Sequence, residues 1–212
     1  MPTTPQLIPS LIESAASAIQ SHAEEVTALD QAIGDGDHVV NLQRGLGALS
    51  KQAESLAALD WPAALQQIGM TLMASVGGAS GSLYGTLFIA MGKAMKGREM
   101  NPANLAEAFS QGVEAMKARG KAERGEKTML DVLIPVADVL KSAAEHAIAP
   151  GQLAEEVSRA AEAGMESTRD MLATKGRASF LGERVIGHVD AGARSSQLMI
   201  SAIAEVLSGK SR

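Results

Sequence analysis

Three aspartates crowd into one short stretch of the sequence, Asp30 together with the segment Gly34-Asp35-Gly36-Asp37-His38. Like charges placed this close repel one another, and glycine loses more conformational entropy on folding than any other residue. A bound divalent cation would offset both costs. Mg²⁺ prefers a few carboxylates together with the phosphates of a substrate, so the pattern favours a magnesium site.

Two other interpretations of this stretch differ in strength. Asp35-x-Asp37 begins like an EF-hand calcium loop, but Val40 stands where that loop needs glycine and Leu46 where it needs glutamate, which excludes it. Asp37 as the N-cap of the following helix is the simpler alternative for a single aspartate. Three aspartates with interleaved glycines favour the cation.

A second segment, Gly77-Gly78-Ala79-Ser80-Gly81, precedes a helical pattern. The free N–H groups at a helix N-terminus suit an anion such as phosphate, although a flexible turn capped by Ser80 explains this segment equally well by itself. His38 and His188 also lie in polar connections. Because the sequence has no His-x₃-His pair, a polar contact to a ligand is favoured over zinc binding or nucleophilic chemistry.

The elements that must position these residues are helices. Apolar residues recur at helical spacing almost everywhere, and the alternation typical of strands is missing, which predicts an all-α fold. The eight predicted helices are centred on residues 8–26, 39–56, 61–76, 83–95, 105–116, 129–140, 153–172 and 198–207.

Four of the seven connections between these helices are rich in glycine and charge: those between the first and second, third and fourth, fifth and sixth, and seventh and eighth helices. If neighbouring helices alternate in direction, these connections all fall at the same end of the bundle. The last of them, 175–194, is about twenty residues long, and a structureless connection of that length is usually functional or disordered. The sequence therefore predicts one site formed by four loops, with 175–194 as its lid.

Composition limits the classes of function. The 212 residues carry a net charge of −5 and 46% hydrophobic residues, with neither a basic run nor a set of aromatic stacking residues, which argues against nucleic-acid binding. Without cysteine, disulfides and thiolate metal sites are excluded. The sequence shows no signal peptide and no apolar run of membrane-spanning length, so we expect a soluble cytoplasmic protein without a membrane partner.

The four motifs, taken together and in order, resemble one family. "GDGDH..N", "GGASG..YG", "RGKAERGEKTMLDVLIP" and "KGRASFLGERVIGHVDAGARSS" look like the nucleotide-binding L subunit of dihydroxyacetone kinase, over nearly the whole chain. The resemblance implies a single domain, residues 1–212, folded as a barrel-like bundle of eight antiparallel helices with the nucleotide at one end. Val39 and Ser82 depart from the family pattern, which usually has glycine and proline there.

The resemblance also assigns roles to residues. Asp30, Asp35 and Asp37 are the implied catalytic and metal-binding residues, holding two Mg²⁺ ions that bridge the phosphates of ADP or ATP. Phosphoryl transfer needs positioning and charge neutralisation rather than a protein nucleophile, which fits such a site. The other implied nucleotide contacts are His38, Asn41, Gly78, Ala79, Ser80, Gly120, Thr128, Met129, Arg177, Asp190 and Gly192.

By the same resemblance, the chain is a phosphotransferase subunit that acts with other chains. A separate K subunit would hold dihydroxyacetone, and an M subunit, a phosphocarrier of the sugar phosphotransferase system, would recharge the nucleotide. A split kinase that uses free ATP, and a non-catalytic regulator that signals to a transcription factor, are the alternatives. We expect a homodimer, and candidates for the surface that docks the K subunit are Lys121, Arg124, Lys127 and Arg184.

Overall fold

The computed structural model describes residues 4–146 and 148–209. All regular elements within these ranges are helices, which confirms the predicted all-α class. The α-helices are α1 (Ile8–Ser21), α2 (Ala23–Ile33), α3 (His38–Ser50), α4 (Ala53–Ala57), α5 (Trp61–Ser75), α6 (Gly78–Ala94), α7 (Pro102–Gly120), α8 (Leu130–His146), α9 (Pro150–Ser167) and α10 (Ala191–Leu207), and the 3₁₀ helices are η1 (Pro5–Leu7), η2 (Thr168–Asp170) and η3 (Arg177–Val185).

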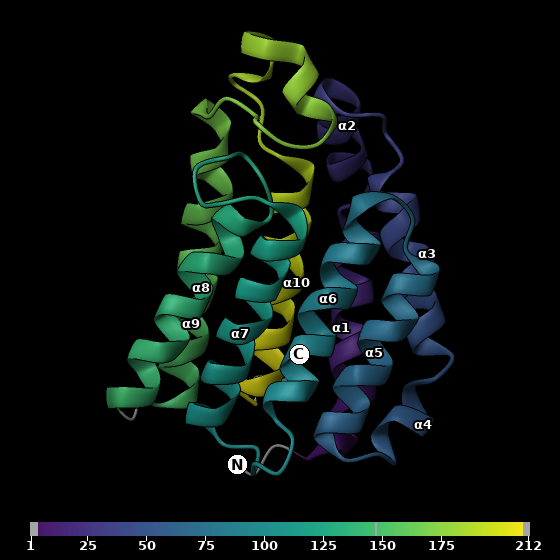
Figure 1. Cartoon of the computed structure of the whole chain (residues 1–212), viewed down its shortest axis with the longest axis vertical. Coiled ribbons are helices and arrows are strands. Elements are labelled where there is room, and N and C mark those ends of the chain that lie inside the picture. The colour runs from purple at the N-terminus through teal and green to yellow at the C-terminus, as the bar shows by residue number, and fades with distance from the viewer. Residues whose placement is uncertain (1–3, 147, 210–212) are drawn as a thin grey trace.

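The long helices lie side by side along the long axis of the molecule (Figure 1). In chain order, α1 packs on α3, α3 on α5, and each of α5 to α9 on the next long helix, while α10 returns to α1. The connections α2–α3, α5–α6, α7–α8 and α9–α10 all lie at one end, which we call the upper end as drawn in Figure 1. The predicted convergence of the four unusual connections is therefore confirmed.

Buried apolar side chains from all the long helices form one core. One close contact within the bundle lies between α5 and α6, where two glycines face each other. A Cβ on Gly69 would lie 2.7 Å from the carbonyl oxygen of Gly85, so neither position has room for a side chain. Among the described helices, none is long and apolar enough to cross a membrane.

Two of the predicted helices are each divided in the structure. The first predicted helix is divided at His22, whose backbone (φ −114°, ψ 17°) leaves the helical region, and α2 then continues to Ile33. The second predicted helix ends at Ser50 and is followed by the short α4. The apolar period continues across both breaks, because the residues beyond each break still face the core, and a period alone does not reveal a change of helix direction.

Candidate functional site

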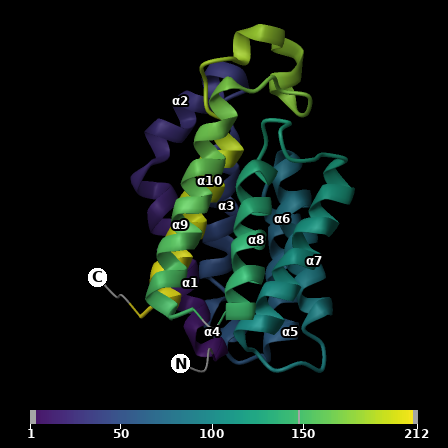
Figure 2. The ribbon, with the colours of Figure 1, turned by 90° about the vertical axis from the view of Figure 1, so that its left-hand side faces the viewer.

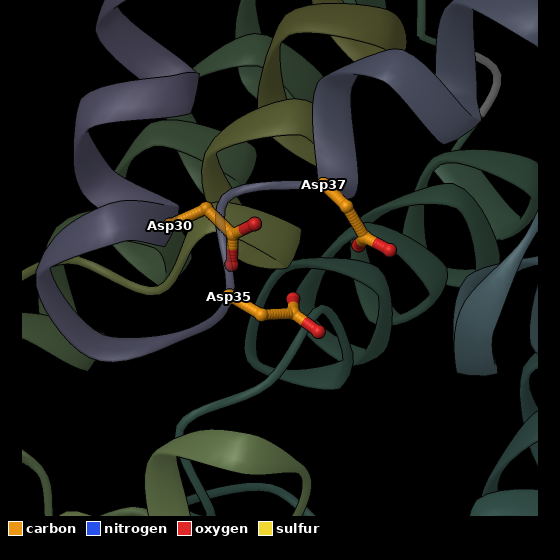
Figure 3. A group of neighbouring side chains, drawn as sticks. All are labelled: Asp30, Asp35 and Asp37. Carbon is orange, nitrogen blue, oxygen red and sulfur yellow. The ribbon is translucent and has the colours of Figure 1, made fainter.

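The three aspartates lie together where α2 passes into α3 (Figure 3). Asp30 belongs to the last turn of α2, Asp35 to the connection, and Asp37 directly precedes α3. One carboxylate oxygen from each residue lies within 4.8 Å of the other two, and the groups are half-buried or exposed. Octahedral Mg²⁺ holds its ligands at about 2.1 Å, so neighbouring ligands are about 3.0 Å apart and opposite ligands about 4.2 Å apart. Shifts of about 1 Å in each side chain would let the three oxygens share an ion.

The glycines in this stretch let the chain fold back over Asp30. A Cβ on Gly34 would lie 2.1 Å from Asp30 Oδ1, so only glycine leaves room for that carboxylate. Gly36 has a φ of +77°, the left-handed region that glycine adopts without strain. The two glycines therefore allow the turn that brings the three carboxylates together, at a cost in conformational entropy on folding.

The simpler interpretation of Asp37, a helix cap, does not hold. Asp37 occupies the N-cap position of α3, but its side chain makes no capping hydrogen bond. The backbone N–H of His38 instead donates to Asp30 Oδ2, at 3.1 Å. The Asp37 carboxylate, free of that task, offers its oxygens to a cation, and three hard oxygen donors are the chemistry that Mg²⁺ selects.

Arg177, the first residue of η3, reaches this cluster from above. Its Nε lies 2.5 Å from Asp35 Oδ2, and its side chain is 74% exposed. The guanidinium is the one cation that the described residues bring to the cluster as a salt bridge. Arg177, which the resemblance assigned to the nucleotide, is therefore within reach of groups bound at the carboxylates.

His38 is held from both sides of its ring. Ser195 Oγ donates to the carbonyl of Gly192 (3.1 Å), so His38 Nε2 is the donor in its 2.8 Å contact with Ser195 Oγ. Nδ1 is then the acceptor for the Ser80 hydroxyl, 3.4 Å away. Burial lowers the pKa of His38 against the opposing charges of the three aspartates. A neutral, fixed imidazole thus links α10 to the start of α6.

The N-terminus of α6 faces the same space. Gly77 is its N-cap, no side chain caps the helix, and Gly78 has a φ of +65°. The alternative in which Ser80 caps this helix is wrong, since Ser80 lies inside the first turn. Asn41 packs against Gly77, where a Cβ would come 2.4 Å from the Asn41 amide oxygen. Uncapped N–H groups with the positive end of a helix dipole form an anion site.

The α7–α8 connection and the start of α10 form the opposite wall. A Cβ on Gly192 would lie 3.4 Å from Met129 Cε and 3.0 Å from Asp190 Oδ2, so the three residues are neighbours. Asp190 caps α10 by accepting from the N–H of Ala193 at 2.8 Å. Burial raises its pKa to about 6, although the Lys127 ammonium opposes this. Thr128 is half-buried beside Met129.

Gly120 stands apart from these contacts. It ends α7, and a Cβ there would meet Leu83 of α6 at 3.2 Å. As the last residue of α7, it lies where that helix reaches the upper end of the bundle (Figure 1). Its neighbours are apolar, as the nucleoside side of a nucleotide site requires.

The segment 171–190 forms a lid above the bundle (Figure 2). The sequence predicted a connection without regular structure, and this expectation was wrong. The lid contains η3, and Ala178 and Val185 bury themselves against Ile33 of α2. The expected range 175–194 also ends too late, because α10 begins at Ala191. Two buried side chains of the lid and one of α2 thus dock this short 3₁₀ helix, and they form no periodic stripe in the sequence.

Four residues of the site were not predicted from the sequence. Ser195 fixes His38, and the buried Tyr84 hydroxyl contacts Ser196 Oγ (2.7 Å) one position further along α10. Asp131 accepts from the backbone N–H groups of Gly125 and Thr128 and so holds the α7–α8 connection in shape. The available signal was the pair of serines in "DAGARSS", five and six residues after Asp190, and the structure buries both of them.

Comparisons with known proteins agree on one family. The sequence model of the DAK2 domain matches residues 32–205. The ADP-binding subunit DhaL of the PEP-dependent dihydroxyacetone kinase 1 of Listeria innocua is 42% identical over 185 residues, which is 87% of this chain and 88% of that protein. The corresponding subunit of Escherichia coli is also 42% identical. Human triokinase/FMN cyclase is 32% identical over 93% of this chain but only 34% of its own length.

Solved structures give the same result for the fold. The dihydroxyacetone kinase of C. freundii, in complex with AMP-PNP and Mg²⁺, matches with a TM-score of 0.73 and 25% sequence identity. The match covers 97% of this chain, and this chain spans about a third of that kinase chain, 35%. The native form of the same kinase matches with a TM-score of 0.74.

Proposed function

The chain belongs to the DAK2 domain family, and from that premise we propose that it is the nucleotide-binding catalytic subunit of a dihydroxyacetone kinase. The observation that carries the proposal is the cluster of Asp30, Asp35 and Asp37 facing the uncapped N-terminus of α6. A cluster of hard oxygen donors beside free N–H groups suits a metal-bound diphosphate. The ADP-binding relatives extend over most of the chain, which supports one domain over residues 1–212.

In the proposed site, each residue has a defined task. Asp30, Asp35 and Asp37 would hold two Mg²⁺ ions, which when bound supply charge neutralisation for the phosphates. The N–H groups of Gly78, Ala79 and Ser80 bind phosphate oxygens. His38, fixed by Ser195 and near Asn41, orients the Ser80 hydroxyl.

The other wall of the site holds the nucleoside. Gly120 lines it from the end of α7, Thr128 and Met129 line it from the α7–α8 connection, and Gly192 leaves the space that a side chain would fill. Arg177 and Asp190 close the site from the lid and its base. A closed lid excludes water, which strengthens every charge interaction beneath it and protects the phosphoryl group from hydrolysis.

The relatives that match this chain over most of their length support a phosphocarrier as the donor. They are named PEP-dependent in Listeria and Escherichia coli and PTS-dependent in Lactococcus lactis. We therefore propose that the bound nucleotide is recharged by an M-type phosphocarrier and passes its phosphoryl group to dihydroxyacetone on a K subunit. Lys121, Arg124 and Arg184 are exposed at the upper end and remain the proposed docking residues.

The experiment is to identify the nucleotide that survives purification and to test its exchange. We expect stoichiometric ADP that resists exchange with labelled ATP on the time scale of turnover. The control is the same protein stripped of metal with EDTA, which should release the nucleotide. Rapid exchange with free ATP would instead support the split ATP-dependent kinase, and absence of nucleotide binding with Mg²⁺ present would refute the proposed function.

A further inference from the structure

Lys127 is the largest fully buried side chain of the described residues, only 1% exposed. Its prediction as a docking residue on the rim is therefore wrong. It lies in the α7–α8 connection with a φ of +60°, a backbone conformation that non-glycine residues seldom adopt. A buried lysine in an unfavourable backbone conformation is costly, so its side chain must contribute something that offsets the cost.

The Lys127 ammonium is surrounded by carbonyl oxygens. Nζ donates to Thr168 O and His188 O, both at 2.5 Å, and makes a longer contact with Arg169 O at 3.4 Å. A lysine ammonium has three N–H donors and no acceptor, so the three carbonyls use its full capacity. Burial lowers the pKa of Lys127, while Asp190, Asp170 and Asp131 oppose that shift.

These carbonyls belong to the two ends of the lid. Thr168 and Arg169 lie where the chain enters it from α9, and His188 lies where the chain leaves it toward α10. The two ends also bond to each other, through the N–H of Gly187 to Arg169 O (2.9 Å) and the N–H of Asp190 to Thr168 Oγ1 (3.0 Å). Where these two ends bond to each other, they form the base of the lid. Lys127 thus connects the base of the lid to a third segment, the α7–α8 connection.

That third segment carries the nucleoside side of the proposed site. Thr128 and Met129 directly follow Lys127, and the preceding Glu126 also holds the lid, accepting from Thr174 Oγ1 at 2.6 Å. Asp131 fixes the same connection from inside the bundle. The position of the Lys127 ammonium therefore sets the distance between the lid and the residues beneath it.

We propose that Lys127 is a positioning residue for nucleotide binding: it holds the base of the lid at the height at which Met129, Asp190 and Gly192 form one wall. This inference rests on the proposed function. A nucleotide that meets a preformed wall spends no binding energy on ordering it. Without the ammonium, the base of the lid would be in place only part of the time, and affinity falls by that fraction.

The test compares Lys127→Met, which keeps the length and removes the donors, with Lys141→Met on the exposed surface of α8 as the matched control. Calorimetric titrations with Mg²⁺–ADP and with Mg²⁺–diphosphate separate the two sides of the site. We expect Lys127→Met to weaken ADP binding about tenfold, as when the competent state falls to about a tenth of the population. Diphosphate binding should change less than about threefold, since the exposed Arg177 is the lid's only contact to the carboxylates among the described residues and such pairs contribute little.

Hydrogen exchange of the backbone amides is a second measurement. In Lys127→Met, we expect faster exchange only in residues 168–190. Lys127→Gln, which keeps two donors, serves if the methionine variant does not fold; failure of both to fold would show a folding role and overturn the proposal. Equal losses for ADP and diphosphate, or no loss, would overturn it as well. Wild-type protein that does not bind ADP would refute the proposed function instead, so the two failures are distinguishable.

Discussion

Removing one carboxylate from the aspartate cluster should raise the free energy of unfolding of the metal-free protein. The same change should lower it in the presence of Mg²⁺–ADP. In Asp37→Asn, two repulsive pairs disappear, those with Asp30 and Asp35. At 4.8 Å in water, each pair costs about 0.9 kcal/mol before screening by salt. We therefore expect the metal-free variant to be more stable than wild type by roughly 1 kcal/mol, with unchanged helical circular dichroism.

The same substitution should abolish retention of the nucleotide. A Mg²⁺ ion about 2.1 Å from a carboxylate oxygen is stabilised by about 4 kcal/mol even at the dielectric constant of water, which corresponds to about a thousandfold in affinity. Thermal unfolding with and without Mg²⁺–ADP measures both effects, the gain in stability without ligand and the lost stabilisation by ligand. Wild type should gain stability with ligand by mass action, and Asp37→Asn should not.

Asp60→Asn is the matched control. Asp60 lies at the other end of the bundle, where it caps α5 by accepting from the N–H of Ala63 at 2.8 Å, and asparagine caps equally well. This variant should behave as wild type in both measurements. If Asp35→Asn and Asp37→Asn both bind Mg²⁺–ADP with wild-type affinity, the assignment of the cluster as a metal site is wrong.

Three further predictions concern the lid, the buried Asp190 and the partner chains. Limited proteolysis should cut 171–187 readily in stripped protein and slowly with Mg²⁺–ADP, because ligand contacts stabilise the lid; equal rates would exclude a ligand-ordered lid. The raised pKa of Asp190, about 6 against an ordinary 3.8, contributes stability that is present below about pH 4 and lost as pH rises through 6. The loss is at most roughly 3 kcal/mol, and Asp190→Asn, measured without nucleotide, should flatten that part of the stability profile; an unchanged profile would show that Asp190 does not titrate there. The purified chain with Mg²⁺, ATP and dihydroxyacetone should form no phosphorylated product until a K subunit and a phosphocarrier are added, and turnover by the chain alone would contradict a site divided between subunits.

Features that depend on the apolar period of a helix or on charges close together in the chain could be predicted from the sequence. The apolar period predicted the helices, and the order of the connections predicted that Asp35, Ser80, Thr128 and Arg177 would lie at one end. Both follow from physics within one or two turns of chain, together with a simple rule for antiparallel neighbours.

What the sequence did not reveal depends on contacts between distant segments. Lys127 reads as a surface lysine because nothing nearby in sequence shows that carbonyls 41 and 61 residues away surround its ammonium. Ser195 similarly acquires its role only because the start of α10 comes close to the start of α3. The division of the first helix at His22 was hidden for the opposite reason, since its apolar period runs through the break.

The start of α1 and the end of α10 have a consequence for any domain joined to the chain there. α1 starts and α10 ends at the lower end of the bundle, opposite the aspartates (Figures 1 and 2). A domain joined at either point would begin about 26 Å from the aspartate end, the length of the 17-residue α10. An extended tether of about eight residues covers that distance, so a joined domain reaches the aspartate end through such a tether or through its own width.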